Sequence, residues 1–122
     1  MGTLHGSIFL RNRSDTKCVL EKVPEVTLLD KSGRNIPVKV EPNSELNRFG
    51  AGSPRFVLQP GRSAAVFLAT DPNFDENVCG TRMIVSIQGV IVRLKMPACG
   101  PRGERPTVSL SGFVDYSRVK PN

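Results

Sequence analysis

The sequence predicts an all-β protein, an antiparallel immunoglobulin-like β-sandwich of about seven or eight strands. Three observations support this prediction. Short runs alternate apolar and polar residues, clusters of Gly, Pro, Asn and Asp separate the runs, and no segment keeps the apolar period of a helix. A β-barrel is the alternative interpretation. The chain of 122 residues has the length of one domain, so we expect residues 1–122 to form a single unit.

Alternation places the strands along the chain. In the first run Ile8 and Leu10 share one face and Phe9 takes the other. In the last run Val108, Leu110 and Gly112 are expected opposite Ser109, Ser111 and Phe113. Turn residues are expected at 12–15, 31–34 and 60–61. The predicted strands are residues 7–13, 18–30 with a bend at Pro24, 36–40, 56–58, 65–68, the two arms of a hairpin over 79–99, and 108–113.

The hairpin over residues 79–99 is the centre of this prediction. Two β-branched runs meet at Gln88-Gly89, a dipeptide that suits a tight turn. Residues that face each other across such a ladder have numbers that sum to about 177 or 178. Cys79 and Cys99 should therefore face each other and form a structural disulfide. A redox or metal role is disfavoured because the chain has no Cys-x-x-Cys spacing and one His.

Charge and cysteine usage bear on compartment and partners. Seventeen Lys and Arg against eleven Asp and Glu give a cationic chain, but the basic residues are scattered and suit a solvated surface. Nucleic acid is not an expected partner because aromatic residues do not interleave with a basic stripe. No apolar run could span a membrane, and no export signal opens the chain. The predicted disulfide nevertheless favours an extracytoplasmic, secreted or envelope-anchored domain whose export signal is absent from this chain.

Two loops are the candidate binding surfaces. Residues 41–54 lack an apolar period, and residues 71–76 are polar. The second loop resembles the start of a calcium loop, but it lacks the Gly and Glu positions of an EF-hand, so a solvated acidic loop is the expected interpretation. The candidate binding residues in and beside these loops are Asn47, Arg48, Phe49, Arg55, Asp71, Asn73 and Asp75.

Catalysis is not expected. His5 is the only histidine, it lies near the start of the chain, and no base is predicted beside Cys18 or a serine. No glycine-rich phosphate loop opens a helix. No cofactor, metal or catalytic residue is therefore predicted. Cys18 is left without an obvious disulfide partner, so it is expected either to be buried or to have lost a partner outside this chain.

A further observation concerns motifs spread along most of the chain: residues 10–14, 18–20, 24–30 with Gly33, 58–64, Cys79 and Cys99-Gly100. Together they resemble a family of secreted or lipid-anchored actinobacterial domains of unknown function with an immunoglobulin-like fold. The sequence departs from that family at Lys22 and Val23, where Gly and an aromatic residue are usual, and many members have a further upstream cysteine. The resemblance implies an exported, non-enzymatic domain and carries over no active-site residue.

The expected function is thus a binding or structural module of the bacterial cell envelope. A protein partner, contacted through one of the two loops or an exposed sheet edge, is the first hypothesis. The alternative is that Arg and Lys bind an anionic envelope polymer or carbohydrate.

Overall fold

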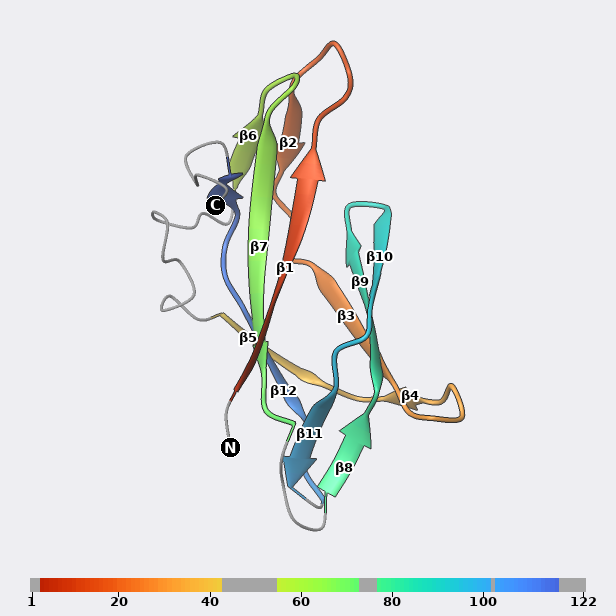
Figure 1. Cartoon of the computed structure of the whole chain (residues 1–122). Helices are drawn as coiled ribbons and strands as arrows, with labels where there is room; N and C mark the ends of the chain where they lie inside the picture. Colours follow the sequence, from red (N-terminus) through yellow and green to blue (C-terminus); the bar gives the residue numbers. More distant parts are fainter. Residues whose placement is uncertain (1–2, 43–54, 73–76, 102, 117–122) are drawn as a thin grey trace.

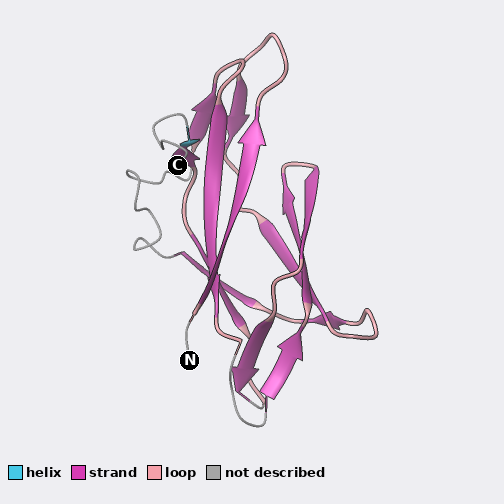
Figure 2. Ribbon diagram, in the orientation of Figure 1, coloured by secondary structure: helices cyan, strands magenta, loops and turns pink. Residues whose placement is uncertain are grey.

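The computed structural model describes residues 3–42, 55–72, 77–101 and 103–116, and these residues form short β-strands (Figures 1 and 2). The strands are β1 Leu4–Arg11, β2 Cys18–Leu20, β3 Glu25–Leu29, β4 Asn35–Ile36, β5 Lys39–Pro42, β6 Phe56–Leu58, β7 Ser63–Thr70, β8 Asn77–Gly80, β9 Arg82–Ile87, β10 Val90–Leu94, β11 Ala98–Pro101, β12 Thr107–Leu110 and β13 Val114–Asp115. The all-β prediction is confirmed. The expected seven or eight strands are instead thirteen shorter segments within the described part of the chain.

The strands form several small sheets. Strands β1, β7, β12 and β5 follow one another in the largest sheet, in which β13 also pairs with β7. A second sheet has the order β10-β9-β3-β4, and two further ladders join β11 to β8 and β2 to β6. The expectation of purely antiparallel pairing is wrong at one ladder, because β12 runs parallel to β5.

Two predicted strands prove to be pairs of strands that lie in different sheets. The run over 18–30 breaks at residues 21–24, so that β2 pairs with β6 whereas β3 pairs with β9. The run over 36–40 breaks at Pro37, so that β4 pairs with β3 whereas β5 pairs with β12. Proline lacks the N–H that a ladder needs, and here it marks the change of sheet.

Side chains from both larger sheets form one hydrophobic core. The alternation predicted for β1 is observed, since Ile8 is buried and Phe9 is half-exposed. The ring of Phe9 contacts that of Tyr116 in a tilted arrangement, with ring centroids 4.4 Å apart. The face predicted for Phe113 is wrong. The strand ends at Leu110, the alternation is lost over residues 111–113, and Phe113 joins Val108 in the core.

The predicted 79–99 hairpin is divided into two ladders. Around the Gln88-Gly89 turn, β9 pairs with β10 so that Val90 faces Ile87. Farther from the turn, β8 pairs with β11 and Cys79 faces Cys99. The residue numbers of facing pairs sum to 177 near the turn and to 178 at the cysteines. One extra residue in the returning arm, over 95–97, accounts for the difference and interrupts the strand.

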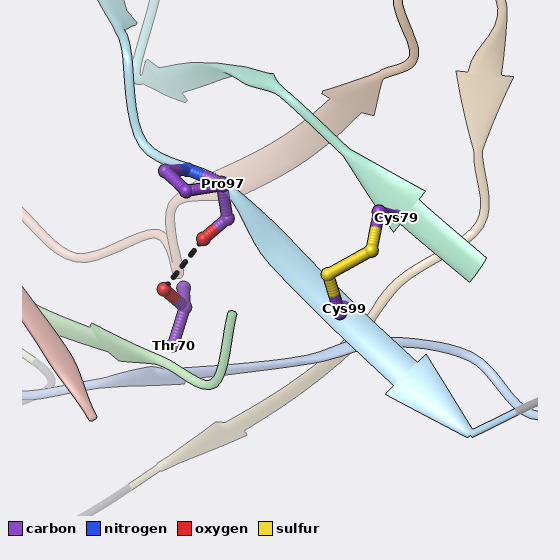
Figure 3. The surroundings of a disulfide bond; sticks show 4 residues. All are labelled: Thr70, Cys79, Pro97 and Cys99. Carbon is purple, nitrogen blue, oxygen red and sulfur yellow. Dashed lines mark hydrogen bonds between the residues drawn. A yellow bond between two sulfur atoms is a disulfide. The ribbon is translucent and has the colours of Figure 1, made fainter. Parts of the chain in front are cut away.

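A disulfide joins Cys79 to Cys99 at the far end of this split hairpin (Figure 3). Beside it, the hydroxyl of Thr70 donates a hydrogen bond of 2.8 Å to the carbonyl oxygen of Pro97. The β8–β11 ladder is thus attached to the end of β7 as well as closed covalently.

The predicted turn at 31–34 is organised by Asp30. Its Oδ1 accepts hydrogen bonds from the Arg34 amide at 2.9 Å and from the Ser32 amide and hydroxyl at 2.8 Å each. These donors, the Arg34 amide first, hold the pKa of the Asp30 carboxyl below its usual value. Gly33 adopts a φ of 87°, which a side chain would disfavour.

Candidate binding surfaces

The candidate residues that the structure describes do not form one site. Arg55 and Asp71 are described, whereas Asn47, Arg48, Phe49, Asn73 and Asp75 lie outside the described residues. Arg55 precedes β6 and its Nε lies 3.8 Å from Oε2 of Glu21. Asp71 directly follows β7, at the end of that strand that is far from β6 (Figure 1). Its carbonyl oxygen accepts a hydrogen bond of 2.8 Å from the Cys99 amide. The structure therefore assigns these two residues to separate regions.

The described residues contain no group of three or more His, Cys, Asp or Glu that could hold a metal ion. The calcium-loop interpretation of residues 71–76 depends on Asn73 and Asp75, which the structure does not describe. No helix in the described ranges is long and apolar enough to cross a membrane.

His5 and Cys18 lie apart. His5 faces Ala69 near the start of β1, whereas Cys18 faces Leu58, whose carbonyl oxygen is bound by Asn12 beyond the end of β1. Asn12 lies seven positions after His5 along an extended chain, a distance of roughly 23 Å. Cys18 is exposed and unbridged, so of the two expectations for this residue the buried cysteine is wrong, and the lost partner stays a prediction.

Asn12 organises the loop that follows β1. Its Nδ2 donates hydrogen bonds of 2.8 Å to the carbonyl oxygen of Thr16 and 2.9 Å to that of Leu58. Its Oδ1 accepts from the amide and hydroxyl of Ser14 at 3.0 and 2.7 Å. The turn chemistry predicted for residues 12–15 is observed, but the reach of the same side chain to β6 is not a local signal and was not predicted.

Replacing Asn12 with alanine should destabilise the fold by about 2–3 kcal/mol, because the buried carbonyl oxygen of Leu58 loses the bond from the Asn12 amide and the Ser14 groups lose their acceptor. The matched control is Ser14→Ala at an exposed neighbour, which should cost less than about 1 kcal/mol. Urea denaturation followed by circular dichroism measures both. Equal effects of the two substitutions would show that the bond from Asn12 to Leu58 contributes little.

Two arginines border a shallow depression over this loop. Arg11, Asn12, Arg13, Ser14 and Gly61 line it. The Asn12 amide already donates its hydrogen bonds to the protein. The groups of this depression that can contact a ligand through charge are therefore the guanidinium groups of Arg11 and Arg13. Such a surface suits an anion.

A second surface is apolar and lies at the tip of the β9–β10 hairpin. Val23, Val90 and Ile91 are exposed by 71, 51 and 59%, and we call these three residues the hairpin patch. Lys22 binds Gln88 through its amide, so Val23 lies beside the turn that leads into Val90. Val90 and Ile91 are consecutive on β10 and point to its opposite faces, so the hairpin patch exposes apolar side chains on both sides of the strand. Exposed apolar side chains near one strand end are typical of interaction surfaces.

The side chain of Gln88 fixes the hairpin patch in place. Its Oε1 accepts hydrogen bonds from the amides of Glu21 and Lys22 at 2.6 and 3.0 Å, and its Nε2 donates to the carbonyl oxygen of Val19 at 2.9 Å. The tip of the hairpin is therefore tied to the β2–β3 connection. Sequence reasoning identified Gln88 as a turn residue, but its contacts are 66 to 69 residues away along the chain and left no local signal.

These elements define an all-β domain with one disulfide and two candidate binding surfaces. The model of a family described as a domain of unknown function, DUF4232, matches residues 1–112, and the chain belongs to this family. No curated protein and no solved structure matches the chain.

Proposed function

We propose that this chain is a non-enzymatic, extracytoplasmic binding module of the cell envelope, with an immunoglobulin-like sandwich, that contacts a protein partner through the hairpin patch. The observation that supports this proposal most directly is the exposure of Val90 and Ile91 on a strand whose other apolar residues pack against the core. The disulfide between Cys79 and Cys99 is compatible with export, since such bonds persist in oxidising compartments.

The test is capture of a partner by the immobilised domain from the envelope fraction of the organism that carries the gene. The patch variant Val90→Ser/Ile91→Ser should reduce recovery of a specific protein at least tenfold. The matched control is Leu4→Ser, which alters an exposed apolar residue at the start of β1 and should leave recovery unchanged. Equal recovery by the patch variant and the wild type would overturn the proposal.

A second candidate function is binding of an anionic envelope polymer at the depression bordered by Arg11 and Arg13. Charge-driven binding should weaken steeply when NaCl rises from about 0.1 to about 0.5 M, whereas contact through the apolar patch should not. Arg11→Gln/Arg13→Gln should abolish polymer binding and leave protein capture intact.

A further inference from the structure

The β9–β10 turn determines which backbone groups of β10 face away from β9. Gln88 and Gly89 have φ values of 46° and 90°, the left-handed pair that a two-residue hairpin of type I′ requires. In such a hairpin the closing pair, Ile87 and Val90, is hydrogen-bonded. The bonding alternates along the ladder, so the N–H and C=O groups of Ile91 and Arg93 point to the opposite side of β10.

That side of β10 is a sheet edge. Within the described ranges β10 pairs with β9 alone, and it ends the order β10-β9-β3-β4. Backbone groups on an open edge are a template for an added strand. The hydrogen bonds of Gln88 hold the hairpin tip against the β2–β3 connection, so this edge is presented in a fixed position.

The side chains along the edge differ between its two faces. Val90 is half-exposed on the core side, where Val92 and Leu94 pack against the core but remain half-buried. The outer side carries exposed Ile91 and Arg93, and Lys95 follows just beyond the strand. An added strand would therefore extend the apolar core on one face and meet Arg93 on the other, with Lys95 just beyond the end of β10.

Charge disfavours a second copy of this chain as the added strand. Strand β10 carries no acidic residue, and antiparallel pairing with itself about Val92 would place Arg93 and Lys95 of both copies along one face. The whole chain has a net charge of +6, which adds to the repulsion. The same cations attract an acidic segment.

We infer that β10 accepts an extended, acidic polypeptide segment by strand addition, with alternate apolar side chains over the core edge and alternate carboxylates beside Arg93 and Lys95. This inference rests on the proposed function and names the chemistry of its partner. Main-chain hydrogen bonds to Ile91 and Arg93 supply the pairing, and the two faces of β10 supply the selectivity.

The probe is a nine-residue peptide, acetylated and amidated, that alternates Val with Glu and carries a fluorophore. Its comparison peptide alternates Val with Lys. Fluorescence anisotropy with the full chain should show at least tenfold tighter binding of the Val/Glu peptide. Equal binding of the two peptides, or binding of neither, would overturn the inference.

Two substitutions at one position separate backbone pairing from charge. Arg93→Ala removes the cation and should weaken the Val/Glu peptide about threefold to tenfold. Arg93→Pro also removes the outward N–H and should weaken it at least tenfold further. Proline at a solvent-facing N–H of an edge strand leaves the β9–β10 ladder bonds in place. Equal affinities of the two variants would overturn strand addition.

Further measurements cover the remaining outcomes. If Arg93→Pro fails to fold, a Val/Glu peptide N-methylated at every residue should lose binding to the wild-type protein, and retained binding would overturn strand addition. A dimer in analytical ultracentrifugation that Arg93→Ala strengthens would overturn the acidic-partner assignment in favour of a second copy.

The capture experiment separates this inference from the proposed function. If the Val90→Ser/Ile91→Ser variant loses a captured protein that Arg93→Pro retains, the proposed function stands and strand addition fails. If no captured protein depends on the patch, the proposed function itself fails.

Discussion

Replacing Gly80 with alanine is expected to destabilise the protein by about 3 kcal/mol, the upper part of the usual range for overpacking a core. A Cβ at Gly80 would lie 2.5 Å from Cδ1 and 2.7 Å from Cδ2 of Leu28, with Cγ closer still. Leu28 has no exposed surface and lies between Met83 and Ile36 in the ladders of its sheet. Its side chain therefore has little space into which to move.

The same contact predicts a partial rescue. Leu28→Ala alone should cost about 2–5 kcal/mol because it leaves a cavity in the core. In the double variant the methyl group introduced by Gly80→Ala enters that cavity, so the combined cost should fall short of the sum by about 1 kcal/mol or more. Urea denaturation of the four proteins of this cycle measures the coupling. Strictly additive costs would show that Leu28 does not limit the size of the side chain at position 80.

Two other glycines serve as controls. Gly6→Ala introduces the same methyl group in a strand, but the nearest atom is the flexible Sδ of Met96 at 3.0 Å, so its cost should stay within about 0.5 kcal/mol. Gly100→Ala places a Cβ 2.8 Å from the backbone nitrogen of Pro106. That variant should be destabilised and should not be rescued by Leu28→Ala, because the obstacle is backbone.

Local patterns located turns and strand-forming runs along the chain. The Gln88-Gly89 dipeptide predicts the hairpin turn and, through the numbering of facing residues, brings Cys79 to within one residue of Cys99; the extra residue over 95–97 completes the alignment. Alternation predicts the faces of Ile8 and Phe9 because a buried face repeats every second residue.

Alternation does not identify the sheet to which a strand belongs. The residues on either side of Pro24 read as one bent strand, yet β2 and β3 pair with partners in different sheets. The parallel pairing of β12 with β5 joins segments that are far apart along the chain, and no local pattern encodes it. Such pairings are set by tertiary contacts.

The candidate surfaces were predicted less well for the same reason. Within the described ranges β10 lies at a sheet edge, but the sequence did not identify which strand would do so. The hairpin patch is visible only when burial is known, because Val90 and Ile91 belong to an apolar, β-branched run in the sequence. The hydrogen bonds of Gln88 to the β2–β3 connection likewise depend on the folded chain.

Removing the disulfide with Cys79→Ala/Cys99→Ala should destabilise the protein by about 3 kcal/mol. The bond closes a loop over a sequence separation of 20, and the chain-entropy model gives a cost of this size for such a loop. For a small domain this is a large part of the total free energy of unfolding. Urea denaturation with and without reductant should show the same loss in the wild-type protein. The matched control is Cys18→Ser at an exposed, unbridged cysteine, which should change stability by less than about 0.5 kcal/mol.

The neighbours of the disulfide determine how the loss should be distributed. The β8–β11 ladder has four facing pairs, too few to be stable alone, but the bonds from Thr70 to Pro97 and from Cys99 to Asp71 attach β11 to the end of β7. The end of β8 is attached by one bond, from the Thr81 amide to the carbonyl oxygen of Leu29, whereas two bonds attach β11 to the end of β7. Reduction should therefore increase amide hydrogen exchange more in β8 than in β11. Equal increases in the two strands would show that the disulfide, and not the bonds to β7, holds β11 in place. Unchanged exchange in both strands would show that the folded ladder does not depend on the covalent bond.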